Sequence, residues 1–190
     1  MATQFSIGLM NRFASVLNSL GFTSKDLTKL IQTKEILRGL KAVLRGTAEF
    51  KFDKRFIDCD AEPATLQMGW KIRKHKKQGW LEWNPSKIKL FLSKKQHKES
   101  ASGRELYKEL SRMPVLNANV LDHLLQYPEL IPEEWNGKEI FFWGTIYENT
   151  DGTLLVRCLG GGMKELGWDC GCVDDDWGNT HANPAAVLKQ

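Results

Sequence analysis

The sequence predicts an α+β protein, in which a small N-terminal helical unit is followed by antiparallel β meanders packed with short helices. In residues 1–46, apolar side chains recur at three- and four-residue spacing, which is typical of amphipathic helices. Later, short β-prone runs alternate with turn signals, and residues 139–159 form two apolar runs around an Asn-Thr-Asp-Gly turn. We therefore expect a helical unit over residues 1–46 and a mixed, β-rich domain over residues 47–190, with helices at about residues 103–127.

Charge is distributed unevenly along the 190 residues. The net charge is +4, but residues 68–98 hold ten Lys and Arg against one Glu, so the rest of the chain sums to −5. Such patterning bears on binding partners. No run approaches the roughly 18 apolar residues of a membrane helix, and four cysteines are too few for a dense disulfide framework. We expect a cytoplasmic protein with reduced thiols and no membrane partner.

Three short helices are expected in the N-terminal unit. An apolar stripe reaches Leu20 before Gly21 stops it, and Thr23 or Ser24 can cap the second helix. The third, residues 34–45, is expected to bury Ile36, Leu37, Leu40, Val43 and Leu44. Its other side carries a basic stripe that fits the last helix of a helix-turn-helix, or simply a solvated face: Lys34, Arg38, Lys41 and Arg45.

Residues 70–93 are interpreted as an antiparallel meander. Turn signals at residues 78–79 and 84–86 leave three short runs, of which the last, residues 88–92, alternates apolar and polar side chains. A helix over residues 84–95, capped by Asn84, is the alternative.

Two helices and a hairpin follow. Ser102 and Glu105 form a capping-box pattern, and Asn117 or Asn119 can cap a second helix that stops at Tyr127. The hairpin of residues 139–159 has two apolar faces, so other parts of the chain must cover at least one of them. We expect the helices to pack on it. A further strand is expected over residues 168–173. We expect one joint core of Phe142, Trp143, Ile146, Leu121, Leu124 and Leu125.

Part of the chain resembles a family of small bacterial or phage proteins of unknown function. The resemblance is carried by residues 114–147, which read PVLNANVLDHLLQYPELIPEEWNGKEIFFWGTIY, and extends to residues 57–60, 154–159 and 183–186. It implies a bacterial or phage origin and one shared fold. It implies no activity, catalytic residue or cofactor.

The sequence favours a binding protein over an enzyme. Residues 68–98 interleave cations with aromatic side chains, which suits an acidic protein partner. The alternative is a nucleic acid, whose phosphates attract cations and whose bases stack on aromatics, bound by this surface or by the basic third helix. The residues expected to bind are Lys71, Arg73, Lys74, Lys76, Lys77, Trp80, Trp83, Lys87, Lys89, Lys94 and Lys95.

A zinc-binding or catalytic protein is the less favoured reading. The cluster with metal-ligand residue types is Cys158, Cys170, Cys172 and His181, and its one-residue gap between cysteines is a poor match to structural zinc sites. We expect unmodified thiols that behave as small apolar side chains, and no metal or cofactor. The four histidines lie in no catalytic pattern.

Overall fold

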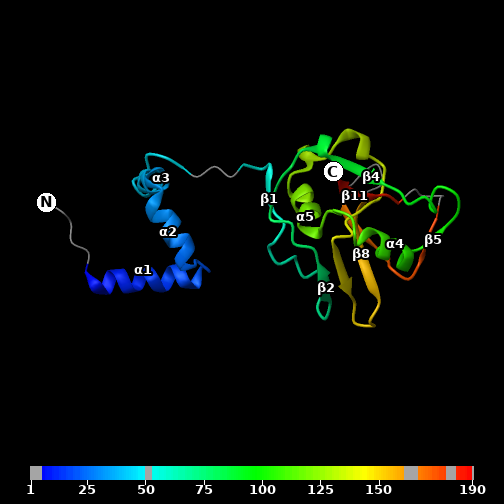
Figure 1. Cartoon of the computed structure of the whole chain (residues 1–190), viewed down its shortest axis with the longest axis horizontal. Coiled ribbons are helices and arrows are strands. Elements are labelled where there is room, and N and C mark those ends of the chain that lie inside the picture. The colour runs from blue at the N-terminus through cyan, green and yellow to red at the C-terminus, as the bar shows by residue number, and fades with distance from the viewer. Residues whose placement is uncertain (1–5, 50–52, 161–166, 179–182, 190) are drawn as a thin grey trace. The chain divides into compact units, whose positions relative to one another are not determined.

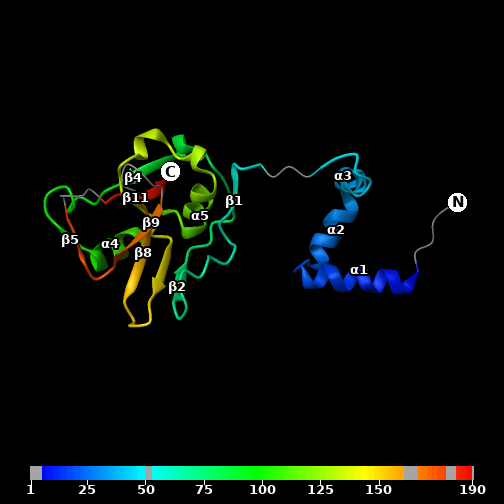
Figure 2. The ribbon, with the colours of Figure 1, turned by 180° about the vertical axis from the view of Figure 1, so that it is seen from behind.

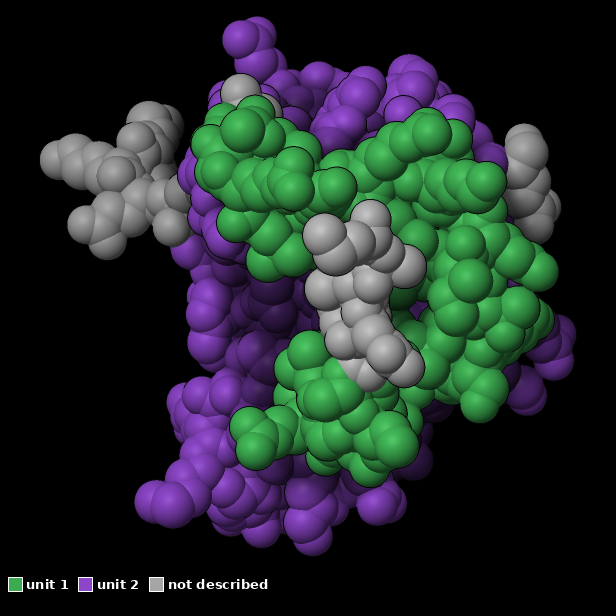
Figure 3. Space-filling model, turned by 90° about the vertical axis from the view of Figure 1, so that its left-hand side faces the viewer, with its two compact units in different colours: residues 1–52 green, residues 53–190 purple. Residues whose placement is uncertain are grey.

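The computed structural model describes residues 6–49, 53–160, 167–178 and 183–189 (Figure 1). The chain divides into two compact units, Met1–Phe52 and Asp53–Gln190, called unit 1 and unit 2 and coloured separately in Figure 3. Helices and a mostly antiparallel sheet occur in the same chain, which is therefore α+β, as predicted. None of the helices in the described ranges combines the length and hydrophobicity needed to cross a bilayer.

Unit 1 contains three helices near their predicted positions: α1 (Ile7–Ser19), α2 (Ser24–Gln32) and α3 (Lys34–Leu44). Gly21 follows α1 at φ +80° and Gly46 follows α3 at φ +67°, a left-handed conformation that glycine adopts without strain. Thr23 and Asp26 form a capping box at the start of α2, where each side chain accepts from the other's backbone N–H.

The prediction that α3 buries its apolar stripe is wrong. Ile36 is 51% exposed and Leu44 is 79% exposed, while Leu40 and Val43 are half-buried. Within the described part of unit 1, Leu17 is the one hydrophobic side chain that is fully buried. Three helices of 9 to 13 residues are too small to cover one another's apolar faces, because little surface can be buried in so small a unit.

Unit 2 is organised around a seven-stranded sheet that forks at one long strand, β8. Both β7 and β6 pair along the same edge of β8, and β9 pairs along the other edge, so β7–β8–β9 is the predicted antiparallel meander. One branch continues from β7 to β2; the other runs from β6 through β11 to β4. The strands are β2 (Lys71–His75), β4 (Ile88–Phe91), β6 (Ile140–Phe141), β7 (Thr145–Glu148), β8 (Leu154–Gly160), β9 (Gly167–Cys172) and β11 (Ala185–Leu188).

Smaller elements complete unit 2. Two ribbons pair β1 (Phe56–Asp58) with β3 (Trp80–Glu82) and β5 (Ala101–Ser102) with β10 (Asp176–Trp177). The predicted caps are present, with Ser102 at α4 (Gly103–Leu110) and Asn117 at α5 (Ala118–Gln126). Three 3₁₀ turns lie at η1 (Pro85–Lys87), η2 (Pro128–Leu130) and η3 (Glu133–Trp135). The two views of the ribbon show β4 and β11 side by side (Figures 1 and 2).

The start of α5 is held in the fork of the sheet. The backbone N–H of Leu116 donates to the carbonyl oxygen of Ala186 on the β11 branch at 2.9 Å. The carbonyl oxygen of Leu116 accepts from the backbone N–H of Gly144, just before β7, also at 2.9 Å. The side chain of Asn117 is fully buried and donates to the carbonyl oxygens of Cys59 (2.8 Å) and Lys76 (3.0 Å). A buried amide needs such partners, so this polar junction ties both branches to α5.

The hairpin is buried on both faces, as its apolar pattern predicts. Phe142 packs with Leu121, Leu124 and the half-buried Leu125, whereas Trp143 and Ile146 belong to a second core cluster. The joint core expected from the sequence is therefore divided between two faces. The cause is the turn at residues 142–144, which separates β6 from β7 and breaks the alternation of side chains.

The predicted meander over residues 70–93 is wrong in its pairing. Its three strands form where expected, but β2 pairs with β7, β3 with β1, and β4 with β11. The alternative helix survives only as the single turn η1, which Asn84 caps. Turn signals place strand ends correctly, but the choice of partner depends on which apolar faces meet across the core.

Candidate interaction surface

The cations of residues 68–98 belong to two ends of the forked sheet rather than to one paired surface. Arg73 and its neighbours lie on β2, and Lys89 lies on β4, so strand pairing does not merge them. Cations on an outer strand discourage pairing with another chain, as does the irregular register between Ile72 and Lys74. Protection of the two edges is a structural role that these cations can fill without a ligand.

Several of these cations have partners within unit 2. Arg73 forms an ion pair with Glu148 at 2.5 Å, and the Lys76 ammonium donates to the Met113 carbonyl oxygen. Lys95 forms an ion pair with Glu105 at 2.8 Å, which raises the pKa of Lys95. The Lys74 ammonium lies 5.0 Å from the centre of the Tyr107 ring. Other members of the set are exposed: Lys71, Lys77, Lys87, Lys89 and Lys94.

The two tryptophans of the predicted surface differ sharply. Trp80 on β3 is 71% exposed, whereas Trp83 is 4% exposed. The indole N–H of Trp83 donates to Leu130, and its ring packs edge-on against Trp135. Trp83 is a core residue and cannot stack on a ligand, so its predicted role in binding is wrong.

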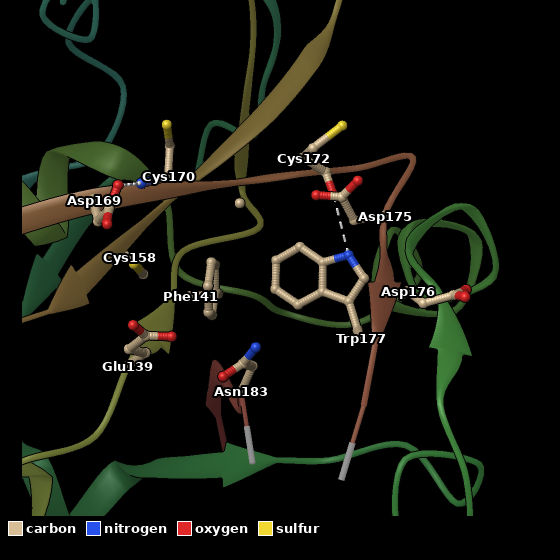
Figure 4. Close-up of a pocket in the computed structure, with 11 residues that line it drawn as sticks. Glu139, Phe141, Cys158, Asp169, Cys170, Cys172, Asp175, Asp176, Trp177 and Asn183 are labelled. Atoms are coloured by element: carbon tan, nitrogen blue, oxygen red, sulfur yellow. Dashed lines mark hydrogen bonds between the residues drawn. The ribbon is translucent and has the colours of Figure 1, made fainter. Parts of the chain in front are cut away.

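The candidate metal cluster is not assembled among the described residues. Cys158 on β8 is the cross-strand neighbour of Asp169, whereas Cys170 is the neighbour of Arg157, so these two cysteines face opposite sides of the sheet. Figure 4 shows Cys170 and Cys172 on the far side of β9 from Phe141. His181 lies outside the described residues. Elsewhere in the described ranges, no three His, Cys, Asp or Glu side chains gather to hold a metal ion.

A cavity of about 170 Å³ lies beside β9 (Figure 4). Its apolar wall includes Phe141 and Trp177, and its polar residues are Glu139, Asp169, Asp175, Asp176 and Asn183. Burial raises the pKa of the Cys158 thiol to about 12, so this thiol stays neutral and is a poor nucleophile. Among the described residues of the lining, none is a histidine that could act as its base. The buried Cys158 thiol therefore has no imidazole base among the described residues of the lining.

Unit 1 exposes most of its large apolar side chains. On α1, such residues recur at three- and four-residue spacing and so share one side of the helix. The large apolar residues exposed on the three helices and the turn after α1, here called the apolar face, are Ile7, Leu9, Met10, Phe13, Val16, Leu20, Phe22, Ile31, Ile36, Leu37 and Leu44. Large apolar side chains that are exposed in such number in one small unit favour a site of interaction.

Unit 1 also accounts for the net positive charge of the chain. Residues 1–52 contain eight Lys and Arg against three Asp and Glu, a net charge of +5, which leaves −1 for residues 53–190. On α3, Lys41 lies four residues from Leu37 and three from Leu44, so the basic and apolar stripes adjoin. All four cations of the predicted basic stripe are exposed: Lys34, Arg38, Lys41 and Arg45.

Unit 1 departs from a helix-turn-helix in one respect. Only Thr33 separates α2 from α3, whereas that motif uses a turn of three or four residues. In Figure 1, α1 lies across the view, α2 runs obliquely and α3 is seen end-on, so the three axes do not share a plane.

Sequence reasoning missed the apolar face, because it assigned these side chains to a core. The available signal was the number of large apolar residues in three short helices, which exceeds what such helices can bury in one another. Comparison of the chain with protein-family models, curated proteins and solved structures finds no match.

Proposed function

We propose that this protein is a non-enzymatic binding protein whose unit 1 docks on an acidic, amphipathic surface of a partner protein. The supporting observation is that eleven exposed large apolar side chains and an exposed basic stripe occupy the same small unit. Association would remove the apolar face from water, which is favourable by about 25 cal/mol per Å². The adjoining cations would then face acidic side chains of the partner.

Two other occupants of the apolar face fit the observations less well. A second copy of unit 1 would bring two units of net charge +5 together, and like charges across an interface are costly. A bilayer surface is flat, whereas the three helix axes do not share a plane (Figure 1). An acidic helix laid against the apolar face would bring its carboxylates to the adjoining cations of α3.

The proposal is tested with designed helical peptides as probes. Two labelled peptides carry the same leucine stripe, with Glu on the remaining face of one and Lys on that of the other. Fluorescence anisotropy with the full chain is expected to show at least tenfold tighter binding of the Glu peptide. Equal binding of both peptides, or of neither, overturns the proposal. So does binding only to anionic phospholipid vesicles, or a dimer in sedimentation at the same concentrations.

A matched pair of variants on α1 locates the surface. Replacing Leu9, Phe13 and Val16 by Gln keeps helix propensity but removes apolar side chains, so binding of the Glu peptide should be lost. The control replaces Asn11, Ser15 and Asn18, on the polar side of the same helix, by Ala. All seven tryptophans lie in unit 2, so their fluorescence reports whether unit 2 remains folded. Equal loss in both variants would contradict the assignment.

Nucleic-acid binding by α3 is the second candidate, favoured by the exposure of its four cations. If this candidate is right, the logarithm of the association constant should fall by about 0.9 for each phosphate contact when the salt concentration rises tenfold. Replacing Lys34, Arg38, Lys41 and Arg45 by Gln should abolish it. No retention on single-stranded or duplex DNA at low salt removes this candidate.

A further inference from the structure

A second cavity, of about 310 Å³, opens in unit 2 on the side of β2 and β7. One wall consists of strand residues, and another comes from the irregular segment of residues 61–69. Ile72 and Tyr147 are cross-strand neighbours on β2 and β7, so their side chains lie together on one face of the sheet. Trp70, just before β2, has its ring centre 6.5 Å from that of Tyr147, at an angle of 55°.

Part of the wall of this cavity is apolar and incompletely covered. Leu66, Trp70 and Ile72 are half-buried and pack against a small cluster that contains the fully buried Tyr147. Apolar atoms that border unfilled space lack the dispersion contacts of a close-packed interior. A flat apolar group in the cavity would supply them, and tilted aromatic contacts at 4.5 to 7 Å are favourable.

Two opposite charges also line the cavity. Glu62 belongs to the irregular segment and Lys71 begins β2, and both are exposed. A carboxylate can hold an ammonium group and an ammonium can hold a carboxylate. A volume of about 310 Å³ lies at the small end of ligand pockets.

From these observations we infer that the cavity binds a small aromatic zwitterion, a planar ring that carries one ammonium and one carboxylate group. The ring would lie among Leu66, Trp70, Ile72 and Tyr147. The two charges would face Glu62 and Lys71. This site belongs wholly to unit 2 and does not depend on the proposed role of unit 1.

The probes are L-tryptophan, indole and N-acetyl-L-tryptophanamide, of which only the first carries both charges. NMR titration of the ¹⁵N-labelled full chain with L-tryptophan is expected to give saturable shifts at Leu66, Trp70, Ile72 and Tyr147. Affinity should be at least tenfold higher for L-tryptophan than for either uncharged probe. Equal affinity for the three, saturable shifts confined to other residues, or no saturable shift overturns the inference.

Variants separate the ring site from the charge sites. Leu66→Trp fills the cavity and should abolish binding of all three probes. If this variant does not fold, Thr65→Phe replaces it, because it narrows the cavity from the exposed segment and should have the same effect on binding. Glu62→Gln and Lys71→Gln should each weaken L-tryptophan at least threefold and leave indole unchanged. Their controls are Glu82→Gln and Lys77→Gln, exposed residues outside the lining. Binding that survives both cavity-filling variants contradicts the site.

Discussion

The backbone N–H of Gly144 donates to the carbonyl oxygen of Leu116 at 2.9 Å, which joins the hairpin to the start of α5. A Cβ atom added at Gly144 would lie 2.8 Å from the Leu116 oxygen and from Cα and Cβ of Asn117. The Leu116 oxygen and the Asn117 Cα belong to the backbone, so they cannot shift as readily as the end of a flexible side chain. Glycine at residue 144 is therefore a requirement of the fork in the sheet.

Gly144→Ala should destabilise unit 2 by about 1–3 kcal/mol, the usual cost of overpacking a core. The measurement is urea unfolding followed by tryptophan fluorescence. Gly178→Ala is the control, because a Cβ atom there would have its nearest contact among the described residues at 3.8 Å, with Ser100. If the two variants have the same urea midpoint, the junction relaxes around the added methyl group, and the requirement for glycine at residue 144 is contradicted.

The ion pair between the buried Arg157 and the partly exposed Asp122 makes a second test. Arg157 on β8 is 2% exposed, and its Nη2 lies 2.7 Å from the Asp122 carboxylate on α5. Its Nε and Nη1 have no hydrogen-bond partner among the described residues, and its guanidinium lies over the Trp168 ring. Asp122→Ala should cost about 1–3 kcal/mol, because it leaves the buried Arg157 charge unpaired, although solvent already screens the partly exposed carboxylate.

Removing both charges should cost less than removing one. Arg157→Met combined with Asp122→Ala leaves no buried charge and should recover most of the lost stability in the same urea assay. Glu129→Ala, which breaks the exposed ion pair with Lys54, is the control and should leave the midpoint nearly unchanged. A double variant as unstable as the sum of the single variants would contradict this account.

Local signals in the sequence were sufficient where structure depends on adjacent residues. The capping pair of Ser102 with Glu105 placed the start of α4 correctly, because a cap is made within one turn. The fork was not predictable, because Leu116 pairs with two segments that come much later in the chain. Strand β11 was also missed: its Ala-rich run lacks the β-branched and aromatic residues typical of strands, apart from Val187.

The candidate sites show the same division. The sequence showed that basic residues concentrate in residues 68–98. It could not show that β2 and β4, which carry some of them, end different branches of one sheet. It grouped Cys158 with Cys170, although the pairing of β8 with β9 puts them on opposite faces. The cavity beside Tyr147 depends on an irregular segment with no periodic pattern.

Thiol reactivity should follow burial. Burial raises the pKa of Cys59 and of Cys158 to about 12, so iodoacetamide at pH 8 should modify the half-buried Cys170 and Cys172 first. Mass spectrometry of the folded chain measures the order. The folded state holds these protons more tightly than free thiols of pKa 9.0, so stability should fall as pH rises above about 9. Stability that increases between pH 9 and 11 would contradict the assigned burial.

The lysines on the outer strands should limit aggregation. Replacing Lys74 on β2 and Lys89 on β4 by Val removes a charge from each end of the forked sheet and raises β propensity. Light scattering on warming should then rise earlier than for the unmodified chain. Lys98 and Lys138 lie outside the strands, so their replacement by Val is the control. If both variants scatter equally, edge protection does not explain why lysines lie on β2 and β4.

Hydrogen–deuterium exchange with the Glu peptide tests the proposed binding surface most directly, because it locates binding without any substitution. In the free chain, the short helices of unit 1 should exchange quickly, since little apolar burial holds them. Saturation with the Glu peptide should slow exchange in α1, α2 and α3 and leave residues 53–189 unchanged. Protection confined to unit 2, or no protection at peptide concentrations that saturate anisotropy, would contradict the account.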